Sequence, residues 1–588
     1  MEKELLNKLL KWLTLICIGI LGLLPLIITG VTIIAWATST PFGDVWDHII
    51  KFDNVFSDGI SWGYLWSQHN EHRPVLFRIF NLLVAYFFQF KIELLIYGNF
   101  VLSLINLILV FILLRHNEHT KQHLVIVFGF LLSSWLIFSP IQWENWAEEG
   151  EFVVYLAITG VLLAALGIQK LFNENRGFIT IALGAFLSTY SFGSGMIVWL
   201  AAIPILAFYV YKHKSQKKYL IIWVMLSVAN YIMYSIGYVK PINHPPLAIT
   251  PDAWGDLLLY ILVYLGAPIG ATDIIVSMAS GLGFLVMFLY LAVKGYQAKK
   301  IDALIPWVFI VVFVLGVSVL TGIVRSGFGI GQAMGSRYMT NTVFAWISVG
   351  VMWATYYFST LNNKNITKSY NLILITSLIG IIALALVPSY REGIKGMNTR
   401  FSILERGYDT ILNYKFVPSR ITADFAPNPE LFYKGAKVLE KRHLGPFAKI
   451  DYKKIIPELS EAQSSSVVGF IDPVNIFPDK NELIINGWAV EPGTIEPTDR
   501  VYIIIDDSKV LSIKPTSLRP DVEKVLGIKK SNMDKVLVKT FGLEKTYGWS
   551  IILSLDRIGK GKHTIKGFVK AANSESYLLL SGIDEFDT

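Results

Sequence analysis

The sequence contains little charge and almost no cysteine. Only 16% of its 588 residues are Asp, Glu, Lys or Arg and 53% are hydrophobic, which excludes a soluble enzyme and requires most of the chain to lie in lipid. The one cysteine, Cys17, lies inside the first apolar run, so a disulfide framework is excluded. We interpret this thiol as a packing residue.

Several catalytic and nucleotide-binding motifs are also missing. The chain has no Walker A loop, paired CxxC, HExxH or GxSxG motif, which argues against ATP-driven transport, structural zinc, a zincin protease and a serine hydrolase. The net charge of +8 does not predict nucleic acid as a partner, because the basic residues are scattered through short gaps between apolar runs.

What the sequence does contain is a series of apolar runs in its first 388 residues. A helix needs about 20 apolar residues to cross a bilayer. The predicted spans are 12–36, 95–114, 124–138, 152–170, 178–190, 196–211, 219–236, 274–293, 304–323, 340–360 and 370–388.

Two further apolar runs, 75–90 and 257–270, are predicted to lie at the interface or to re-enter it. With that assignment the basic loops fall mainly on one side, as the positive-inside rule requires. The result is a polytopic protein of the cytoplasmic membrane with eleven transmembrane helices. Its N-terminus lies in the cytoplasm and its C-terminal part lies outside.

The first outer loop, residues 37–94, carries an unusual set of acidic residues. If residues 43–52 are helical, one face presents Asp44, Asp47, His48 and Lys51, and the other presents Val45, Trp46, Ile49 and Ile50. This pattern is typical of a helix in a membrane interface, and an amphipathic linker with solvated acids would show it equally well. The loop contains no Asp-x-Asp pair.

The same loop includes the run His69-Asn70-Glu71-His72-Arg73-Pro74, whose histidines and glutamate could ligate a metal. The tetrapeptide recurs at 116–119 in a predicted cytoplasmic loop, so it is not specific for a site. We expect neither a divalent metal nor another cofactor.

Two later outer loops supply further candidate residues. Loop 139–151 contains Glu144 and Glu148 on one helical face, where either could orient an acceptor or both could simply be hydrated. Loop 324–339 contains Arg325 and the run Ser336-Arg337-Tyr338. Two outward arginines against an inward basic bias suggest an anionic ligand at the outer interface, although such side chains also reach lipid phosphates.

Beyond residue 388 the hydrophobicity falls. Residues 389–462 combine helical periodicity with prolines and predict an extracytoplasmic helical cap. Residues 463–588 show period-two segments and predict a soluble all-β sandwich, in which Asp506-Asp507 forms a turn. The predicted strands are 467–471, 483–490, 500–506, 510–514, 537–541, 548–554, 563–570 and 576–580.

The order of these features in residues 1–388 resembles the GT-C superfamily of integral membrane glycosyltransferases, which includes bacterial surface-glycan transferases. The shared features are a span, a large outer loop with acids on an interfacial helix, a basic-proline step at His72-Arg73-Pro74, and a second interfacial helix. The resemblance implies a GT-C-like fold and a polyprenyl-phosphate sugar as donor. An Asp of the first outer loop then acts as the base, with Asp44 as first choice and Asp47 as second.

The implied chemistry suits these residues. A carboxylate within about 3 Å can take the proton of the acceptor hydroxyl, and a single base without an enzyme nucleophile predicts inversion. The resemblance places Arg337 and Tyr338 on the donor phosphate, and Arg325 and Arg73 could join them because guanidinium groups stay charged and bind phosphate bidentately. His69, Glu71 and His72 are secondary candidates. The acceptor would be a cell-surface glycan or its lipid-linked precursor, as for a rhamnosyl-, glucosyl- or mannosyltransferase.

The C-terminal region has a resemblance of its own. The runs Asn486-Gly487-Trp488, Arg519-Pro520-Asp521 and Tyr547-Gly548-Trp549 resemble a small β-sandwich attached to some bacterial glycosyltransferases, which implies a carbohydrate-binding module. Trp488 and Trp549 could equally be core residues. Two other functions stay open: a flippase or transporter of lipid-linked sugars, and a membrane-anchored glycan-binding scaffold.

Overall fold

The computed structural model describes residues 2–116, 123–241, 245–270, 272–361, 368–448, 450, 455, 457–459, 463–464, 468–491, 496–527, 545–570 and 577–588. These residues form two compact units. Unit 1 comprises Met1–Ala35, Ser61–Phe80 and Leu94–Met397, and unit 2 comprises Trp36–Ile60, Asn81–Glu93 and Asn398–Thr588.

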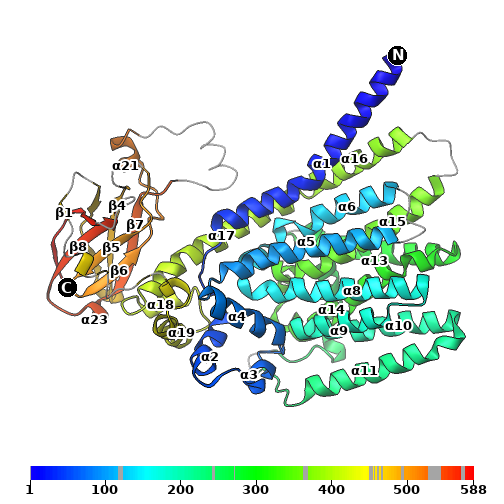
Figure 1. Ribbon diagram of the computed structural model, residues 1–588, viewed down its shortest axis with the longest axis horizontal. Coiled ribbons are helices and arrows are strands. Elements are labelled where there is room, and N and C mark those ends of the chain that lie inside the picture. The colour runs from blue at the N-terminus through cyan, green and yellow to red at the C-terminus, as the bar shows by residue number, and fades with distance from the viewer. Residues whose placement is uncertain are drawn as a thin grey trace. The chain divides into compact units, whose positions relative to one another are not determined.

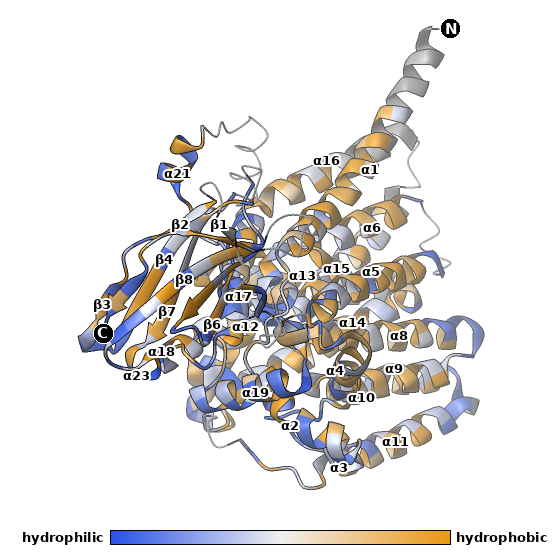
Figure 2. Cartoon of the chain, turned by 60° about the vertical axis from the view of Figure 1, so that its left-hand side comes forward, coloured by the Kyte–Doolittle hydropathy of each residue, from blue (hydrophilic) through white to orange (hydrophobic). Residues whose placement is uncertain are grey.

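Most helices of the first part of the chain are long and apolar, and Figure 2 colours these as hydrophobic. Their bounds are α1 (Glu2–Trp36), α2 (Val45–Asp58), α3 (Trp62–Trp66), α4 (Val75–Phe88), α5 (Glu93–His116), α6 (His123–Ile137), α7 (Trp143–Ala147), α8 (Phe152–Glu174), α9 (Phe178–Ser191), α10 (Ile197–Lys212), α11 (Lys217–Ser235), α12 (Trp254–Gly270), α13 (Ile274–Gln297), α14 (Ile301–Arg325), α15 (Met339–Leu361), α16 (Lys368–Ala385) and α17 (Val387–Leu412) (Figure 1).

Eight helical segments among the described residues are long and apolar enough to cross a membrane, or up to nine if a bent pair counts as one span. The chain is therefore a multi-pass membrane protein. The eight are Ile16–Trp36, Glu93–His116, His123–Ala147, Glu149–Glu174, Gly193–Lys212, Pro251–Gly270, Ile274–Gln297 and Ile301–Phe328.

This set differs from the eleven predicted spans. The predicted span 178–190 forms α9, which has only 14 residues, and α11 and α15 carry polar residues that keep them outside the apolar set. The predicted span 370–388 contributes to a pair of helices, Ser377–Ala385 and Val387–Leu412, that are bent by 49°. Conversely, the run 257–270, which we predicted to lie at the interface or to re-enter it, belongs to an apolar segment of 20 residues because a turn from Pro251 extends it.

Helices α12 and α13 pack unusually closely. A Cβ atom at Gly266 would lie 1.8 Å from the carbonyl oxygen of Ser277, and one at Gly281 would lie 1.9 Å from that of Leu262. Small residues permit such backbone contact between apolar helices, where lipid offers no hydrophobic driving force for association. The indole of Trp346 on α15 donates a hydrogen bond to the carbonyl of Leu265, which is 2.8 Å away.

Unit 2 contains two β-sheets that share one core, which confirms the predicted all-β C-terminal region. One sheet has the order β1-β9-β8-β5-β6 with β11 on β8, and the other has the order β10-β2-β4-β3 with β7 on β4. The strands are β1 (Gln463–Ser464), β2 (Gly469–Ile471), β3 (Asn475–Phe477), β4 (Glu482–Ala489), β5 (Val501–Ile505), β6 (Lys509–Ile513), β7 (Gly548–Ser554), β8 (Lys562–Lys570), β9 (Tyr577–Leu579), β10 (Ser581–Gly582) and β11 (Glu585–Asp587).

Alternating residues of the two sheets meet in the interior, among them Leu483 and Ile485 from β4 and Ile503 and Ile505 from β5. This is the arrangement of a sandwich. Asp506 and Asp507 have φ angles of 53° and 48° and form the turn between β5 and β6, as predicted. The predicted strand 537–541 lies outside the described residues.

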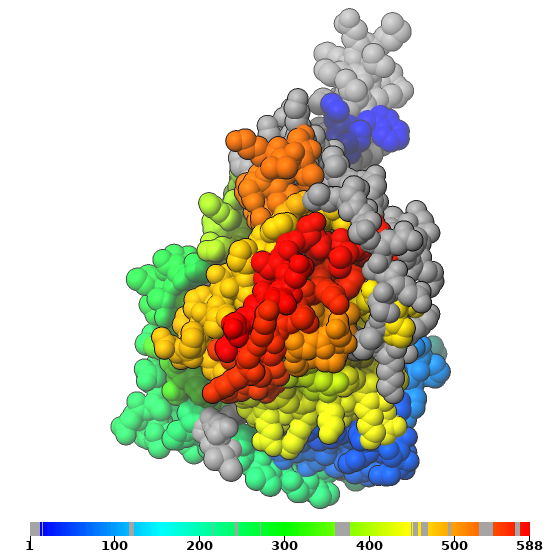
Figure 3. Space-filling view, turned by 90° about the vertical axis from the view of Figure 1, so that its left-hand side faces the viewer, coloured from blue at the N-terminus to red at the C-terminus, as the bar shows by residue number. Residues whose placement is uncertain are grey.

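The last strands, coloured red, run across the surface of the sandwich (Figure 3).

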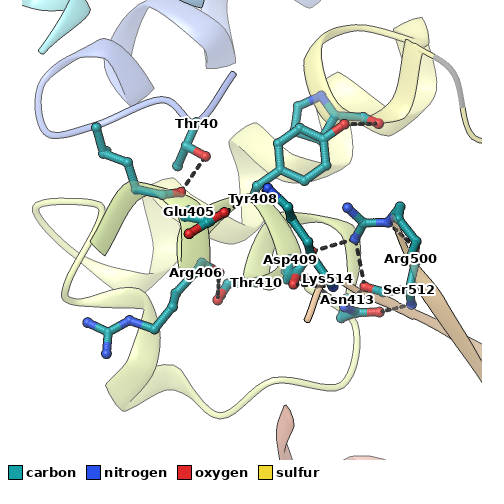
Figure 4. Close-up of polar contacts among 12 residues, drawn as sticks. Thr40, Glu405, Arg406, Tyr408, Asp409, Thr410, Asn413, Arg500, Ser512 and Lys514 are labelled. Atoms are coloured by element: carbon teal, nitrogen blue, oxygen red, sulfur yellow. Dashed lines mark hydrogen bonds and ion pairs between the residues drawn. The ribbon is translucent and has the colours of Figure 1, made fainter. Parts of the chain in front are cut away.

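A polar network holds the end of α17 to the sandwich (Figure 4). Asp409 pairs with Arg500 and also accepts a hydrogen bond of 2.8 Å from the backbone N–H of Lys514. Asn413 and Ser512 exchange two hydrogen bonds of 2.8 and 3.0 Å, which continue the strand pairing onto a side chain. In this unit the predicted cap includes the end of α17 together with α18 (Ser419–Thr422) and α19 (Pro429–Arg442). Two short helices, α21 (Pro520–Val525) and α23 (Leu555–Ile558), lie within the sandwich sequence.

Candidate functional site

The acidic helix of the first loop is α2, which belongs to unit 2. Asp44 is its exposed N-cap residue and Asp47 lies in its first turn, where the helix dipole favours a carboxylate. The chain reaches this start through Gly43, whose φ of 58° suits glycine and whose N–H donates to the carbonyl of Phe425 over 2.8 Å.

The apolar face of α2 is covered by protein. Trp46 is fully buried, its ring lies 5.0 Å from that of Phe432 on α19, and its indole N–H donates to the carbonyl of Phe425 over 3.1 Å. The amphipathic pattern therefore serves packing against α19. His48 is also buried, at 2% exposure, so our placement of this residue on the solvated face is wrong. The side of α2 that is covered by protein extends beyond the apolar residues of the helix and includes His48.

An ion-pair cluster anchors the other end of α2. Asp53 lies 2.7 Å from Lys441 and 2.5 Å from Arg442, both on α19. Hydrogen bonds from these two side chains hold the pKa of Asp53 below its usual value. The position of the Asp44 and Asp47 carboxylates thus depends on the α2–α19 contact.

The histidine-rich run forms a tight turn in unit 1. His69 and His72 exchange two backbone hydrogen bonds of 2.9 Å, and Asn70 at the tip has a φ of 48°. The backbone N–H of Gly193 donates to His72 Nδ1 over 3.2 Å, so a neutral His72 carries its proton on Nε2. This turn places Glu71 and His72 at the edge of a pocket.

Arg73 follows directly and is 4% exposed. Its guanidinium donates to the carbonyl oxygens of Trp66, Tyr234 and Ile236, and its charge lies 5.3 Å from the centre of the Trp66 ring. These bonds occupy all three guanidinium nitrogens. We therefore assign Arg73 to holding the first loop against α11 and do not place it on a phosphate.

The pocket has a volume of about 340 Å³ and lies among the ends of helices in unit 1. Its apolar wall includes Phe192, Met196, Leu247, Leu320 and Val324. Its polar lining includes Glu71, His72, Ser194, Tyr234, Tyr238, Lys240, Arg325 and Tyr338. An apolar wall with a few convergent polar groups is typical of a ligand site.

Arg325 and Glu71 form an ion pair at this pocket, with 24% and 18% of their side chains exposed. Arg325 also lies over the ring of Phe328, at 5.9 Å from its centre. No other hydrogen bond of the Arg325 guanidinium occurs within the described part of the chain. Partial burial and the nearby Glu71 carboxylate raise the pKa of Tyr238, which keeps that hydroxyl protonated.

Arg337 and Tyr338 are positioned by the loop that contains Glu144. The Glu144 carboxylate accepts hydrogen bonds from the Ser336 hydroxyl, at 2.6 Å, and from the Arg337 backbone N–H, at 3.0 Å. The side chain of Asn145 donates to the Arg337 carbonyl over 3.0 Å. Glu144 therefore holds the backbone of the 336–338 turn.

The Arg337 guanidinium lies over the ring of Tyr338, at 5.5 Å from its centre, and makes no hydrogen bond within the described residues. Although surrounding protein desolvates Arg337 and so lowers its pKa, the neighbouring Tyr338, Glu144, Glu151 and Glu148 raise it more, and the net change is upward. The group is a permanent cation with donors to spare.

The structure thus brings Glu71, His72, Arg325 and Tyr338 to one pocket, with His69 in the adjoining turn, and it joins Arg337 to Glu144 next to Tyr338. Glu148 accepts a hydrogen bond through its carbonyl oxygen from Asn99 over 3.2 Å. Asp44 and Asp47 belong to unit 2 and all these residues belong to unit 1.

Sequence reasoning missed Lys240, Tyr234 and Tyr238 as pocket residues. Lys240 carries a signal that could have revealed it, because it is another basic residue in a predicted outer loop. The two tyrosines have none, since aromatic residues at helix ends are common in any membrane protein.

Among the described residues, no group of three or more His, Cys, Asp or Glu side chains is arranged to hold a metal ion. No protein-family model matches this chain, and no curated protein sequence matches it.

Proposed function

We propose that this protein is a membrane-embedded glycosyltransferase of GT-C type that takes a sugar from a polyprenyl-phosphate donor. It adds the sugar to a surface glycan or to a lipid-linked acceptor at the outer face of the cytoplasmic membrane. The observation that carries the proposal is the pocket of about 340 Å³ in unit 1, where Arg325 and Lys240 lie beside a carboxylate and three tyrosines.

This lining suits a phosphosugar with a lipid tail. Arg325 and Lys240 provide positive charge for the phosphate, the tyrosine hydroxyls provide hydrogen bonds for the sugar, and the apolar wall accommodates the start of the prenyl chain. Arg337, next to Tyr338, adds a cation whose donors are unoccupied within the described residues.

In the transfer step, the acceptor hydroxyl forms a bond to the anomeric carbon while the bond from that carbon to the phosphate oxygen breaks. The leaving polyprenyl phosphate keeps the bonding electron pair, so negative charge grows on its oxygens, where Arg325, Lys240 and Arg337 stabilise it. A carboxylate takes the hydroxyl proton. Asp44 is our first choice for this base, Asp47 the second, and Glu71 the alternative inside the pocket.

The test is a transfer assay with the purified protein in lipid nanodiscs and a panel of polyprenyl-phosphate hexoses and deoxyhexoses, each offered with lipid-linked glycan acceptors. The readout is product mass. We expect transfer from one donor class, and a loss of about 100-fold in Arg325→Met and Asp44→Asn, in line with the loss of a charge-stabilising group or a base.

The matched control is Arg176→Met, which removes an exposed arginine of a different loop and should leave transfer unchanged. Retained activity in Asp44→Asn with loss in Glu71→Gln would move the base to Glu71. Absence of transfer from every donor, or full activity in Arg325→Met, would contradict the proposal.

A further inference from the structure

Three short runs of the sandwich, Asn486-Gly487-Trp488, Arg519-Pro520-Asp521 and Tyr547-Gly548-Trp549, converge on one sheet. Strands β4 and β7 pair in antiparallel register, so that Trp488 lies opposite Gly548 and Gly487 lies opposite Trp549. Each tryptophan therefore faces the glycine of the other run, and the two indoles point to opposite faces of the sheet.

Trp549 points inward. It is 1% exposed within the core of the sandwich, and a Cβ atom at Gly487 would lie 2.3 Å from its ring. Its indole cannot contact a ligand. Trp488 points outward and is only partly buried, with Val490, Val522 and Tyr547 packed against it. Of the two aromatic candidates, only Trp488 is accessible.

The outer face around Trp488 carries a row of aromatic rings beside a row of polar groups. Phe470 on β2 is directly opposite Trp488 in register and is 39% exposed. On the same face of β4, the Ser550 hydroxyl donates a hydrogen bond to the side-chain oxygen of Asn486 over 2.6 Å. The backbone N–H of Asp472 donates to the backbone carbonyl of Asn486, which brings Asp472 beside it.

Arg519 completes this face. Ser517, two residues earlier, exchanges backbone hydrogen bonds with Gly548 at the start of β7. The aliphatic part of the Arg519 side chain packs against Gly548, in space that a side chain at position 548 would fill. Its guanidinium lies 2.9 Å from Asp472 and 2.7 Å from Asp521, so its plane is fixed. Asp472 balances the charge of Arg519, and Asp521 adds one negative charge beside them.

We infer that this patch, consisting of Phe470, Asp472, Asn486, Trp488, Arg519 and Ser550, is a binding site for a neutral glycan. Flat aromatic rings take the C–H face of a pyranose, while amide, carboxylate and hydroxyl groups that are already oriented receive its hydroxyls, and Arg519 holds the Asp472 carboxylate in place. The patch has no unpaired positive charge, which disfavours a phosphate or a polyanion. The Asn486 side-chain nitrogen makes no hydrogen bond within the described residues and can donate to a sugar oxygen.

The site is separate from glycosyl transfer. It lies wholly in unit 2 and involves none of the residues assigned to the reaction. If both hold, the sandwich retains the acceptor or product glycan while the residues assigned to the reaction act on its end. If transfer fails, glycan binding can still hold, because its residues and its assay are different.

The test is saturation-transfer NMR with the full-length protein in nanodiscs of phosphatidylcholine, which avoids sugar-based detergents. The probes are maltohexaose, an α-linked mannohexaose and an α-linked rhamnohexaose. We expect at least one to bind, with its dissociation constant raised about tenfold or more in Phe470→Ala and in Asn486→Ala. Neither side chain belongs to the core of the sandwich, so we expect both variants to fold.

The matched control is Phe477→Ala on β3. Phe477 belongs to the same sheet and is also 39% exposed, but it pairs with Glu482, at the other end of β4 from Trp488. Binding should be unchanged in this variant. Lack of binding by all three probes, binding unaffected by Phe470→Ala and Asn486→Ala, or equal loss in Phe477→Ala would overturn the assignment.

Discussion

Two arginine–carboxylate pairs, one in each unit, have the same chemistry and different surroundings. Arg500 and Asp409 in unit 2 are each 14% exposed, and both groups make several further bonds: Arg500 to the side chain and carbonyl of Ser512, and Asp409 to the N–H of Lys514. Arg325 and Glu71 in unit 1 are more exposed and line a pocket, and Arg325 keeps donors that no described residue uses.

The comparison shows that a charge pair is structural or ligand-binding according to how many of its bonds the protein satisfies. A satisfied buried pair cannot accept a ligand without losing what holds it, whereas a partly satisfied pair at a pocket can exchange its carboxylate for a phosphate. Burial alone lowers the pKa of Arg500, but Asp409 beside it raises the pKa of Arg500 by more, so this arginine stays charged.

The largest effect is expected from breaking the structural pair. Asp409→Ala leaves the Arg500 charge without its partner in a largely buried place, which should lower the free energy of unfolding of unit 2 by about 3 kcal/mol. Hydrogen exchange of β5 and β6 amides, followed by mass spectrometry, measures this. Exchange unchanged from the wild type would contradict a structural role.

A double replacement sharpens the same point. Asp409→Leu together with Arg500→Met removes both charges and keeps similar volume, so unit 2 should recover to within about 1 kcal/mol of the wild type. The same hydrogen-exchange measurement applies. A double variant as unstable as Asp409→Ala would show that packing or the bonds to Ser512 dominate, and not the unpaired charge.

The pocket pair should behave differently when it is broken. Glu71→Gln removes the carboxylate charge but keeps the shape and hydrogen-bonding capacity, so we expect a loss of about 1 kcal/mol or less in unit 1, measured by thermal unfolding in nanodiscs. Binding of a polyprenyl phosphate should become tighter, because Arg325 no longer has to leave a competing carboxylate. Weaker binding would mean that Glu71 contacts the donor itself.

The smallest effect concerns pH. The pKa of Asp53 is lowered by its hydrogen bonds to Lys441 and Arg442, so the folded form holds the ionised carboxylate better than the unfolded chain, whose value is near 3.8. The pair therefore stabilises unit 2 above about pH 4, and this contribution disappears as the pH falls through the lowered pKa.

The check is a comparison of the wild type with Asp53→Asn. The melting temperature of the variant should be slightly lower at pH 6, and the two curves should converge below pH 4. A constant difference down to pH 2 would exclude ionisation of Asp53 as its cause.

The predictions from the sequence succeed where a local period fixes the structure. Apolar runs of about 20 residues identify membrane helices, and alternation from residue 463 onward identifies strands, because each side chain's environment repeats with the geometry of its own element. Asp506-Asp507 was predicted as a turn from residue type alone. Short runs are not decided this way: 178–190 includes Thr180, Ser188 and Thr189 and forms a helix of 14 residues, shorter than the eight apolar segments.

The site could be predicted only in part. Arg325, Glu71 and Tyr338 are recognisable as unusual polar residues of two predicted outer loops, and these two loops do meet at one pocket. Arg73 is also an unusual charged residue of a predicted outer loop. In the structure, however, its guanidinium donates its hydrogen bonds to backbone carbonyls of α11 and of the first loop. Which carbonyls come near an arginine depends on how distant segments pack, and no local pattern records that.

The two Gly-Trp pairs show the same difference between what the sequence predicts and what only the structure decides. The residues alone establish that Trp488 and Trp549 belong to strands and that each has a glycine before it. Only the register of β4 against β7 decides that Trp549 enters the core and Trp488 faces outward, because a shift of one residue exchanges the two faces of a strand. Likewise, apolar content by itself places the chain in a membrane. Whether a buried charged side chain is paired within the protein or available to a ligand depends on the groups that folding brings within hydrogen-bonding distance.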